Sequence, residues 1–143
     1  MKKRMALPQP MLVFHSFILS FLHYSNDMTH DNVLYELSKK FALRVIKLYE
    51  YLNEEKKERI MSNQIYRSGT SIGANIAESI NAQSKADFIS KLSIALKEAT
   101  ETKYWLELLC ESGTISDKQF DSIVNDLNII IGTLVNTIKK MKE

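Results

Sequence analysis

The segment that decides the fold is Arg67–Ser79, which reads RSGTSIGANIAES. At ~100° per residue in an α-helix, apolar and small residues in and around this segment fall on one side: Ile65, Gly69, Ile72, Ile76 and Ile80. The opposite side carries a cation, a hydroxyl, an amide and a carboxylate, which we call the polar row: Arg67, Ser71, Asn75 and Glu78. The segment therefore predicts a helix with one edge in a core and a second edge built from polar groups.

Apolar residues recur at spacings of three and four along four segments, residues 32–52, 55–81, 84–113 and 116–141. Ser84 with Asp87 and Ser116 with Gln119 predict helix starts, because this spacing is typical of a capping box. Gly113 predicts the end of the third helix. Because the connections are short, neighbouring helices should be antiparallel. The sequence thus predicts an all-α protein, an antiparallel up-and-down four-helix bundle.

Each helix has an expected core stripe. In the first helix it is Leu34, Leu37, Phe41, Val45, Leu48 and Leu52. In the third it is Phe88, Leu92, Ala95, Ala99, Thr102, Leu106 and Leu109. In the fourth it is Phe120, Val124, Leu127, Ile131, Leu134, Ile138 and Met141. In the second helix, Gly69 and Gly73 form a small-xxx-small pair that should let two helices approach closely.

Composition limits the function classes. A length of 143 residues is enough for one domain with a single packed core, and 45% hydrophobic and 25% charged residues are ordinary for a soluble globular protein. The single Cys110 excludes an internal disulfide and suits a reducing, cytoplasmic compartment, where it is expected to be a small buried residue. The formal charge of +2 comes entirely from residues 1–27. Nucleic-acid binding would therefore depend on a local basic patch.

Residues 1–27 form an N-terminal extension to a four-helix bundle domain over residues 28–143. A basic start followed by the mostly apolar Met11–Tyr24 is similar to the first regions of a signal peptide. Polar residues interrupt this stretch, no small-x-small cleavage site follows, and it is shorter than the ~20 residues that cross a bilayer. Three interpretations stay open: a start assigned too far upstream of Met28, a membrane or export segment, and a docked extra helix. No membrane association is expected for the folded domain.

The third helix carries apolar residues that point away from its core stripe, which we call the outer apolar group: Ile94, Tyr104, Trp105 and Leu108. The first helix also has a wide apolar arc, with Tyr35, Ala42, Ile46 and Tyr49 beside its core stripe. A broad core explains that arc, but it does not explain Tyr104 and Leu108, which lie opposite the core stripe. Exposed apolar patches mark interfaces. The sequence therefore predicts a homo-oligomer.

The polar row has two interpretations. In the structural one, its four side chains satisfy one another at a subunit contact and fix the register. In the functional one, Arg67 belongs to a phosphate-binding surface, because guanidinium groups can donate two hydrogen bonds to phosphate. The candidate nucleic-acid-binding residues are Lys40, Arg44, Lys47, Arg59 and Arg67. Lys40, Arg44 and Lys47 are equally consistent with a solvated helix face that pairs with Glu36 and Glu50.

Three segments resemble the four helix bundle protein family: RSGTSIGANIAES, the run QSKADFISKLSIALKEATETKYWLELL (Gln83–Leu109) and, more weakly, FALRVIKLYEYL (Phe41–Leu52). Its members are encoded within intervening sequences of bacterial large-subunit ribosomal RNA genes. A relative is the accessory protein of diversity-generating retroelements, which works with a reverse transcriptase and RNA. The resemblance, over residues 32–141, implies a bacterial protein, a cyclic ring with a pentamer as the expected form, and a particular role for Arg67 and Glu78. Ser79 departs from the Gly or Ala of many relatives.

No residue pattern favours an enzyme, a metal site or a cofactor. His15, His23 and His30 lie at or before the start of the first helix and lack the spacing of zinc ligands. The Glu-x-x-His motif of di-iron bundles is absent. No small-molecule substrate is expected. The leading hypothesis is a non-enzymatic homo-oligomeric bundle that binds RNA, DNA or a nucleoprotein partner such as a reverse transcriptase. The alternative is a structural or protein-interaction module without nucleic-acid affinity.

Overall fold

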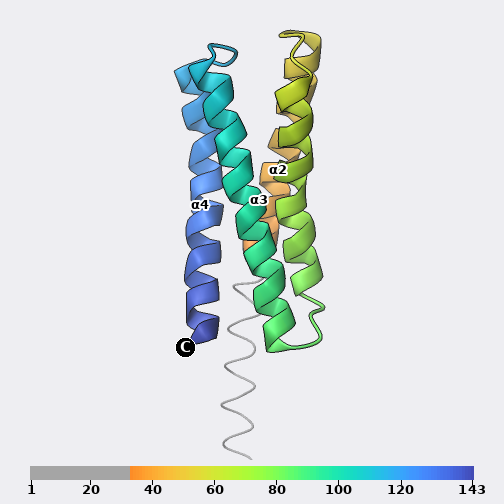
Figure 1. The fold of residues 1–143 in the computed structure, drawn as a ribbon, viewed down its shortest axis with the longest axis vertical. Helices are drawn as coiled ribbons and strands as arrows, with labels where there is room; N and C mark the ends of the chain where they lie inside the picture. Colours follow the sequence, from red (N-terminus) through yellow and green to blue (C-terminus); the bar gives the residue numbers. More distant parts are fainter. Residues whose placement is uncertain (1–32) are drawn as a thin grey trace, which may run out of the picture. The chain divides into compact units, whose positions relative to one another are not determined.

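The computed structural model describes residues 33–143, which form four helices without a strand (Figure 1). The first occupies residues 33–54 of the described part and is called the 33–54 helix. It is followed by α2 (Ile60–Ser79), α3 (Lys85–Glu111) and α4 (Asp117–Lys142). Successive helices run in opposite directions, which confirms the predicted antiparallel up-and-down bundle. The predicted N-terminal extension, residues 1–27, lies outside the described residues.

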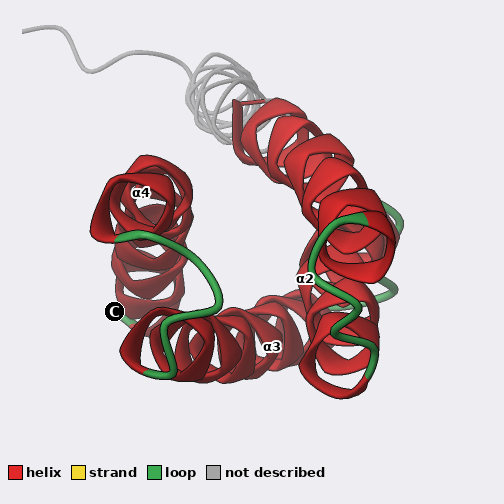
Figure 2. Cartoon of the chain, turned by 90° about the horizontal axis from the view of Figure 1, so that it is seen from above, coloured by secondary structure: helices red, strands yellow, loops and turns green. Residues whose placement is uncertain are grey.

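The four helices follow one another around an arc when seen from above, with the 33–54 helix and α4 at its two ends (Figure 2). Buried residues of all four helices form one hydrophobic core. The predicted core stripe of α3 is confirmed from Leu92 onward, because Leu92, Ala95, Ala99, Thr102, Leu106 and Leu109 are buried. Phe88, its first predicted member, is only half-buried and packs against the core. The stripe of α4 is confirmed in part: Val124, Leu127, Leu134 and Ile138 are buried, but so are Ile123 and Ile130, which the prediction left out.

The small residues of α2 determine how closely it approaches the 33–54 helix. A Cβ atom on Gly69 would lie 2.8 Å from Cγ2 of Val45, so only glycine fits there without movement. A Cβ on Gly73 would lie 3.4 Å from Oγ of Ser38. The predicted role of this glycine pair, close approach of two helices, is confirmed.

The ends of α3 and α4 follow the predicted capping chemistry. Oγ of Ser116 accepts a hydrogen bond from the backbone N–H of Gln119, whose side chain accepts from the N–H of Ser116, a complete capping box. Gly113 has φ +76°. Its N–H donates to the carbonyl of Cys110 at 3.0 Å, and the N–H of Thr114 donates to the carbonyl of Leu109 at 2.9 Å. This is a Schellman motif, which ends α3.

Two boundary predictions for the second helix are wrong. The predicted start at residue 55 fails because residues 55–59 form the connection, in which Lys57 adopts φ 56°. The carboxylate of Glu58 then accepts hydrogen bonds from the first N–H groups of α2, at 3.0 Å from Ile60 and 2.9 Å from Met61. At the other end, the predicted helix reaches residue 81, but α2 ends at Ser79. Ile80, which is predicted on the core side, is 49% exposed.

Candidate interaction surfaces

The polar row faces α3 rather than forming bonds among its own side chains. The guanidinium of Arg67 donates to Glu98 at 3.3 Å and to Glu101 in a short charge-assisted hydrogen bond. The hydrogen bonds that Glu101 accepts, first from Arg67 and then from Trp105, hold the pKa of its carboxyl below the usual 4.5. The hydrogen bond to Glu101 likewise raises the pKa of Arg67. Arg67 therefore ties α2 to α3 within one chain.

The other three residues of the polar row are also satisfied within the chain. Oγ of Ser71 donates to the carbonyl of Arg67 at 2.6 Å, and Nδ2 of Asn75 donates to the carbonyl of Ser71 at 2.8 Å. Glu78 accepts from Nζ of Lys91 on α3 at 2.7 Å, which raises the pKa of Lys91. That the polar row fixes the register of two subunits at a contact between them stays a prediction.

The outer apolar group lies beside these ion pairs. Nε1 of Trp105 donates to Glu101 at 3.2 Å, and the rings of Tyr104 and Trp105 meet edge to face with centroids 5.2 Å apart. Tyr104 is 53% exposed, Ile94 is also exposed, and Trp105 and Leu108 are half-buried. We call the surface that combines the polar row with the outer apolar group the α2–α3 face. Two predicted sets from separate helices are thus neighbours on one face.

The five candidate cations do not gather into one patch. Arg44 of the 33–54 helix reaches α4, where it donates to the Ser122 carbonyl at 2.9 Å and to Asp126 at 2.6 Å. Lys47 pairs with Glu50 of its own helix at 3.0 Å. Lys40 and Arg59 are exposed and form no ion pair with another described residue. Arg67 is held by Glu98 and Glu101 on the α2–α3 face.

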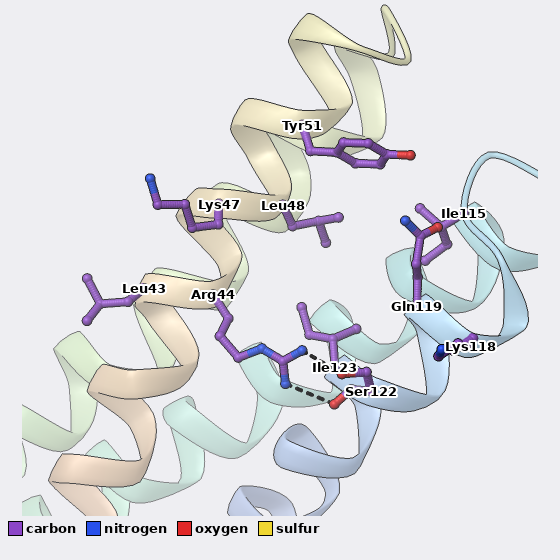
Figure 3. Close-up of a pocket in the computed structure, with 10 residues that line it drawn as sticks. All are labelled: Leu43, Arg44, Lys47, Leu48, Tyr51, Ile115, Lys118, Gln119, Ser122 and Ile123. Carbon is purple, nitrogen blue, oxygen red and sulfur yellow. Dashed lines mark hydrogen bonds between the residues drawn. The ribbon is translucent and has the colours of Figure 1, made fainter.

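A groove lies between the 33–54 helix and the start of α4, and we call it the 33–54/α4 groove (Figure 3). It has a volume of about 690 Å³. Its lining residues are Leu43, Arg44, Lys47, Leu48, Tyr51, Ile115, Lys118, Gln119, Ser122 and Ile123. Lys118 was missed by the sequence analysis. The signal that could have found it is topological, because an up-and-down bundle places the first turn of α4 near the last turns of the first helix.

Other chemistry is sparse in the part of the chain that the structure describes. Residues 33–143 contain no group of three or more His, Cys, Asp or Glu residues placed to hold a metal ion. None of their helices combines the length and the hydropathy needed to cross a bilayer. Cys110 is half-buried rather than buried, and its Sγ donates to Oδ1 of Asp117 at 3.2 Å. That hydrogen bond is the main reason why the pKa of the Cys110 thiol is raised.

The fold and its surfaces define the class of protein as an all-α, up-and-down four-helix bundle. Residues 30–136 match the model of the 23S rRNA-intervening sequence protein family. The chain belongs to this family, which confirms the resemblance seen in the sequence.

A solved structure supports the same assignment. The chain is 55% identical to a protein of unknown function from the S23 ribosomal protein family of Bacteroides thetaiotaomicron VPI-5482. The similarity covers 77% of this chain and 98% of that one, with a TM-score of 0.76. None of the curated proteins that were compared matches the chain. Nothing in these similarities indicates catalysis.

Proposed function

We propose that the protein is a non-enzymatic homo-oligomeric bundle that serves as a nucleic-acid-binding accessory protein, and that its copies associate through the α2–α3 face. The observation that carries the proposal is the exposure of Tyr104 and Ile94 beside the half-buried Trp105 and Leu108. Aromatic residues around a few charged groups are typical of interface centres. Burial of the exposed half of each apolar side chain would contribute roughly 1 kcal/mol.

The ion pairs of Arg67 suit the centre of such a contact. Arg67 is already held by Glu98 and Glu101, so its guanidinium would keep its partners when a second copy covers it. The cluster of one cation and two carboxylates keeps a net negative charge, which the second copy would have to meet with a polar or basic group. Desolvation would strengthen this pairing, which is half exposed in a single chain. A closed ring, with a pentamer as the form implied by the resemblance, repeats the same contact around an axis.

The nucleic-acid part of the proposal rests on the family's link to ribosomal RNA genes and on exposed cations. Arg44, Lys47 and Arg67 would each have to exchange a carboxylate for a phosphate, because each is paired within the chain. Lys40 and Arg59 are exposed without an ion pair to another described residue, so they are the first phosphate contacts to test. In a ring these weak contacts would repeat and add through multivalency.

The alternative, a protein-interaction module without nucleic-acid affinity, has a specific observation in its favour. Three of the five candidate cations are neutralised by carboxylates of the same chain. Single-stranded RNA and duplex DNA titrated against the full chain at rising salt separate the two functions. Phosphate contacts predict affinity that falls steeply with salt and that weakens when Lys40 and Arg59 are both replaced by Glu. An absence of binding at low salt would leave only the alternative.

The oligomer is tested by sedimentation velocity of the full chain at micromolar concentration. We expect a closed assembly that Tyr104→Glu disrupts. Ile129→Glu is the matched control, because Ile129 has a similar exposure on α4 (55%) but does not belong to the α2–α3 face. A monomeric wild-type protein, or an assembly that Tyr104→Glu leaves intact, would overturn the proposal.

A further inference from the structure

We infer that the 33–54/α4 groove binds a short amphipathic α-helix of a partner protein, one whose apolar face is flanked by carboxylates. This inference does not rest on the proposed oligomer or on nucleic-acid binding, because the groove lies between other helices than the α2–α3 face and its apolar lining is available in a single chain.

The floor of the groove is apolar. Ile115, in the connection before α4, and Ile123 of α4 are almost fully buried and still line it, together with Leu48 and Tyr51 of the 33–54 helix. Leu43 lies at one edge with 58% of its surface exposed. In Figure 3, Leu48 and Tyr51 project from the 33–54 helix toward α4. Apolar side chains from two helices that leave about 690 Å³ between them present a surface suited to apolar side chains of a partner.

The length of the groove matches about two turns of helix. Its lining on the 33–54 helix runs from Leu43 to Tyr51, which corresponds to about 12 Å at 1.5 Å per residue. A helix that binds through apolar residues at i, i+3 or i+4, and i+7 presents about 10.5 Å of anchors. At one end, the hydrogen bonds from Arg44 to Ser122 and Asp126 join the two helices and hold the groove walls at a fixed separation.

The charge of the groove calls for acidic groups on the partner. The lining contains three cations, Arg44, Lys47 and Lys118, and no carboxylate. Lys118 forms no ion pair with another described residue, and the Lys47 side chain is 80% exposed in its pair with Glu50, so both can meet a new carboxylate. Charge complementarity of this kind sets orientation and rejects basic partners.

A nucleic acid and the chain's own apolar segment fit the groove less well. Single-stranded nucleic acids need aromatic rings on which bases stack. The lining offers one ring, Tyr51, which also has Nζ of Lys56 5.9 Å from its centroid, and four aliphatic side chains. The segment Met11–Tyr24 is apolar but contains no Asp or Glu, and it follows three basic residues. It therefore has no carboxylate that could pair with Lys47 or Lys118.

The test selects binders for the full-length protein from a displayed library of 16-residue helix-forming peptides. Enriched peptides should carry apolar residues at i, i+3 or i+4, and i+7, with Asp or Glu beside them. One enriched peptide is then labelled, and its affinity is measured by fluorescence anisotropy. Lys118→Glu and Leu43→Asp, both at exposed positions, should each weaken binding at least tenfold. Lys140→Glu, which changes an exposed lysine at the far end of α4, is the matched control and should change it less than twofold.

Charge reversal sharpens the result. A peptide whose flanking carboxylates are replaced by Lys should bind Lys118→Glu more tightly than it binds the wild-type protein. The inference is overturned if no peptide is enriched, as would follow if Met11–Tyr24 or a second copy fills the groove. It is also overturned if enriched peptides bind the Lys118→Glu variant and the wild-type protein with equal affinity. A third contrary outcome is that a single-stranded oligouridine binds the wild-type protein and loses affinity in Leu43→Asp, while no peptide binds.

Discussion

The two sides of the 33–54 helix differ in how they meet their neighbours. Toward α2 the contact is close, because Gly69 lets Val45 approach to a distance at which a Cβ atom would clash. Toward α4 the contact includes the long side chain of Arg44 and a groove of about 690 Å³. The difference shows that the size of the residues at a contact sets the separation of two helices. A small residue gives a dry core, and a long cation gives a surface open to a partner.

The largest expected loss of stability is at the close contact between the 33–54 helix and α2. Gly69→Ala places a methyl group 2.8 Å from Cγ2 of the buried Val45, whose branched side chain has little freedom to move. We expect a net loss of about 1–2 kcal/mol in the free energy of unfolding, after the gain in helix propensity. Urea denaturation measures it. Gly73→Ala is the control and should cost less, because its Cβ would lie 3.4 Å from Ser38 Oγ.

A double-mutant cycle locates the cause of this loss. Val45→Ala alone should be destabilising because it leaves a cavity. In Gly69→Ala with Val45→Ala, the new methyl group enters that space, so the combined loss should be smaller than the sum of the two single losses. Additive losses would show that the contact between these two residues does not set the helix separation.

Substitutions at the contact between the 33–54 helix and α4 should lower the free energy of unfolding less. Arg44→Ala removes the hydrogen bonds to Ser122 and Asp126, but both ion-pair partners are partly exposed, so we expect a loss of about 1 kcal/mol. Lys47→Ala breaks only the exposed pair with Glu50 and should cost at most about 0.5 kcal/mol. Thermal denaturation of both variants makes the comparison. Equal losses would mean that Arg44 does not join the 33–54 helix to α4.

The sequence predicted some helix features of this fold and missed others. The stripe of α3 was predictable because each of its buried residues keeps the heptad spacing. Ile123 and Ile130 were missed because α4 buries a wider arc than one stripe. The predicted start of α2 was wrong because residues 55–59 suit a helix by propensity. In the folded chain the positive φ of Lys57 interrupts the helix, and Glu58 caps a new one that begins at Ile60.

The candidate surfaces were predictable only in part. Periodicity identified the members of the polar row and of the outer apolar group. The partners of the polar row, Glu98, Glu101 and Lys91, depend on the register between α2 and α3, which no single-helix pattern contains. The up-and-down topology could have placed Lys118 near the end of the 33–54 helix, but the 33–54/α4 groove itself depends on the separation of two helices that are distant in sequence.

A smaller effect should appear at the contact between α2 and α3, which relies on exposed ion pairs instead of small residues. The folded-state pKa of Glu101 is lowered by Arg67, so its contribution to stability is present above its usual pKa of 4.5 and is lost as the pH falls through the folded-state value. Glu101→Gln should cost about 0.5 kcal/mol at pH 7. In urea denaturation at pH 3 the difference from wild type should shrink. A difference that is equal at both pH values would contradict this account.

The smallest effect is on reactivity and concerns the contact between α3 and α4. Asp117 raises the pKa of the Cys110 thiol through a hydrogen bond, so less reactive thiolate is present at a given pH. Asp117→Asn should lower that pKa and accelerate alkylation by iodoacetamide at pH 8 about two- to fivefold, without a loss of helix content. Asp121→Asn, which removes a weaker charge effect on the same thiol, should accelerate it less. Equal rates in all three proteins would show that Asp117 does not hold the proton on Cys110.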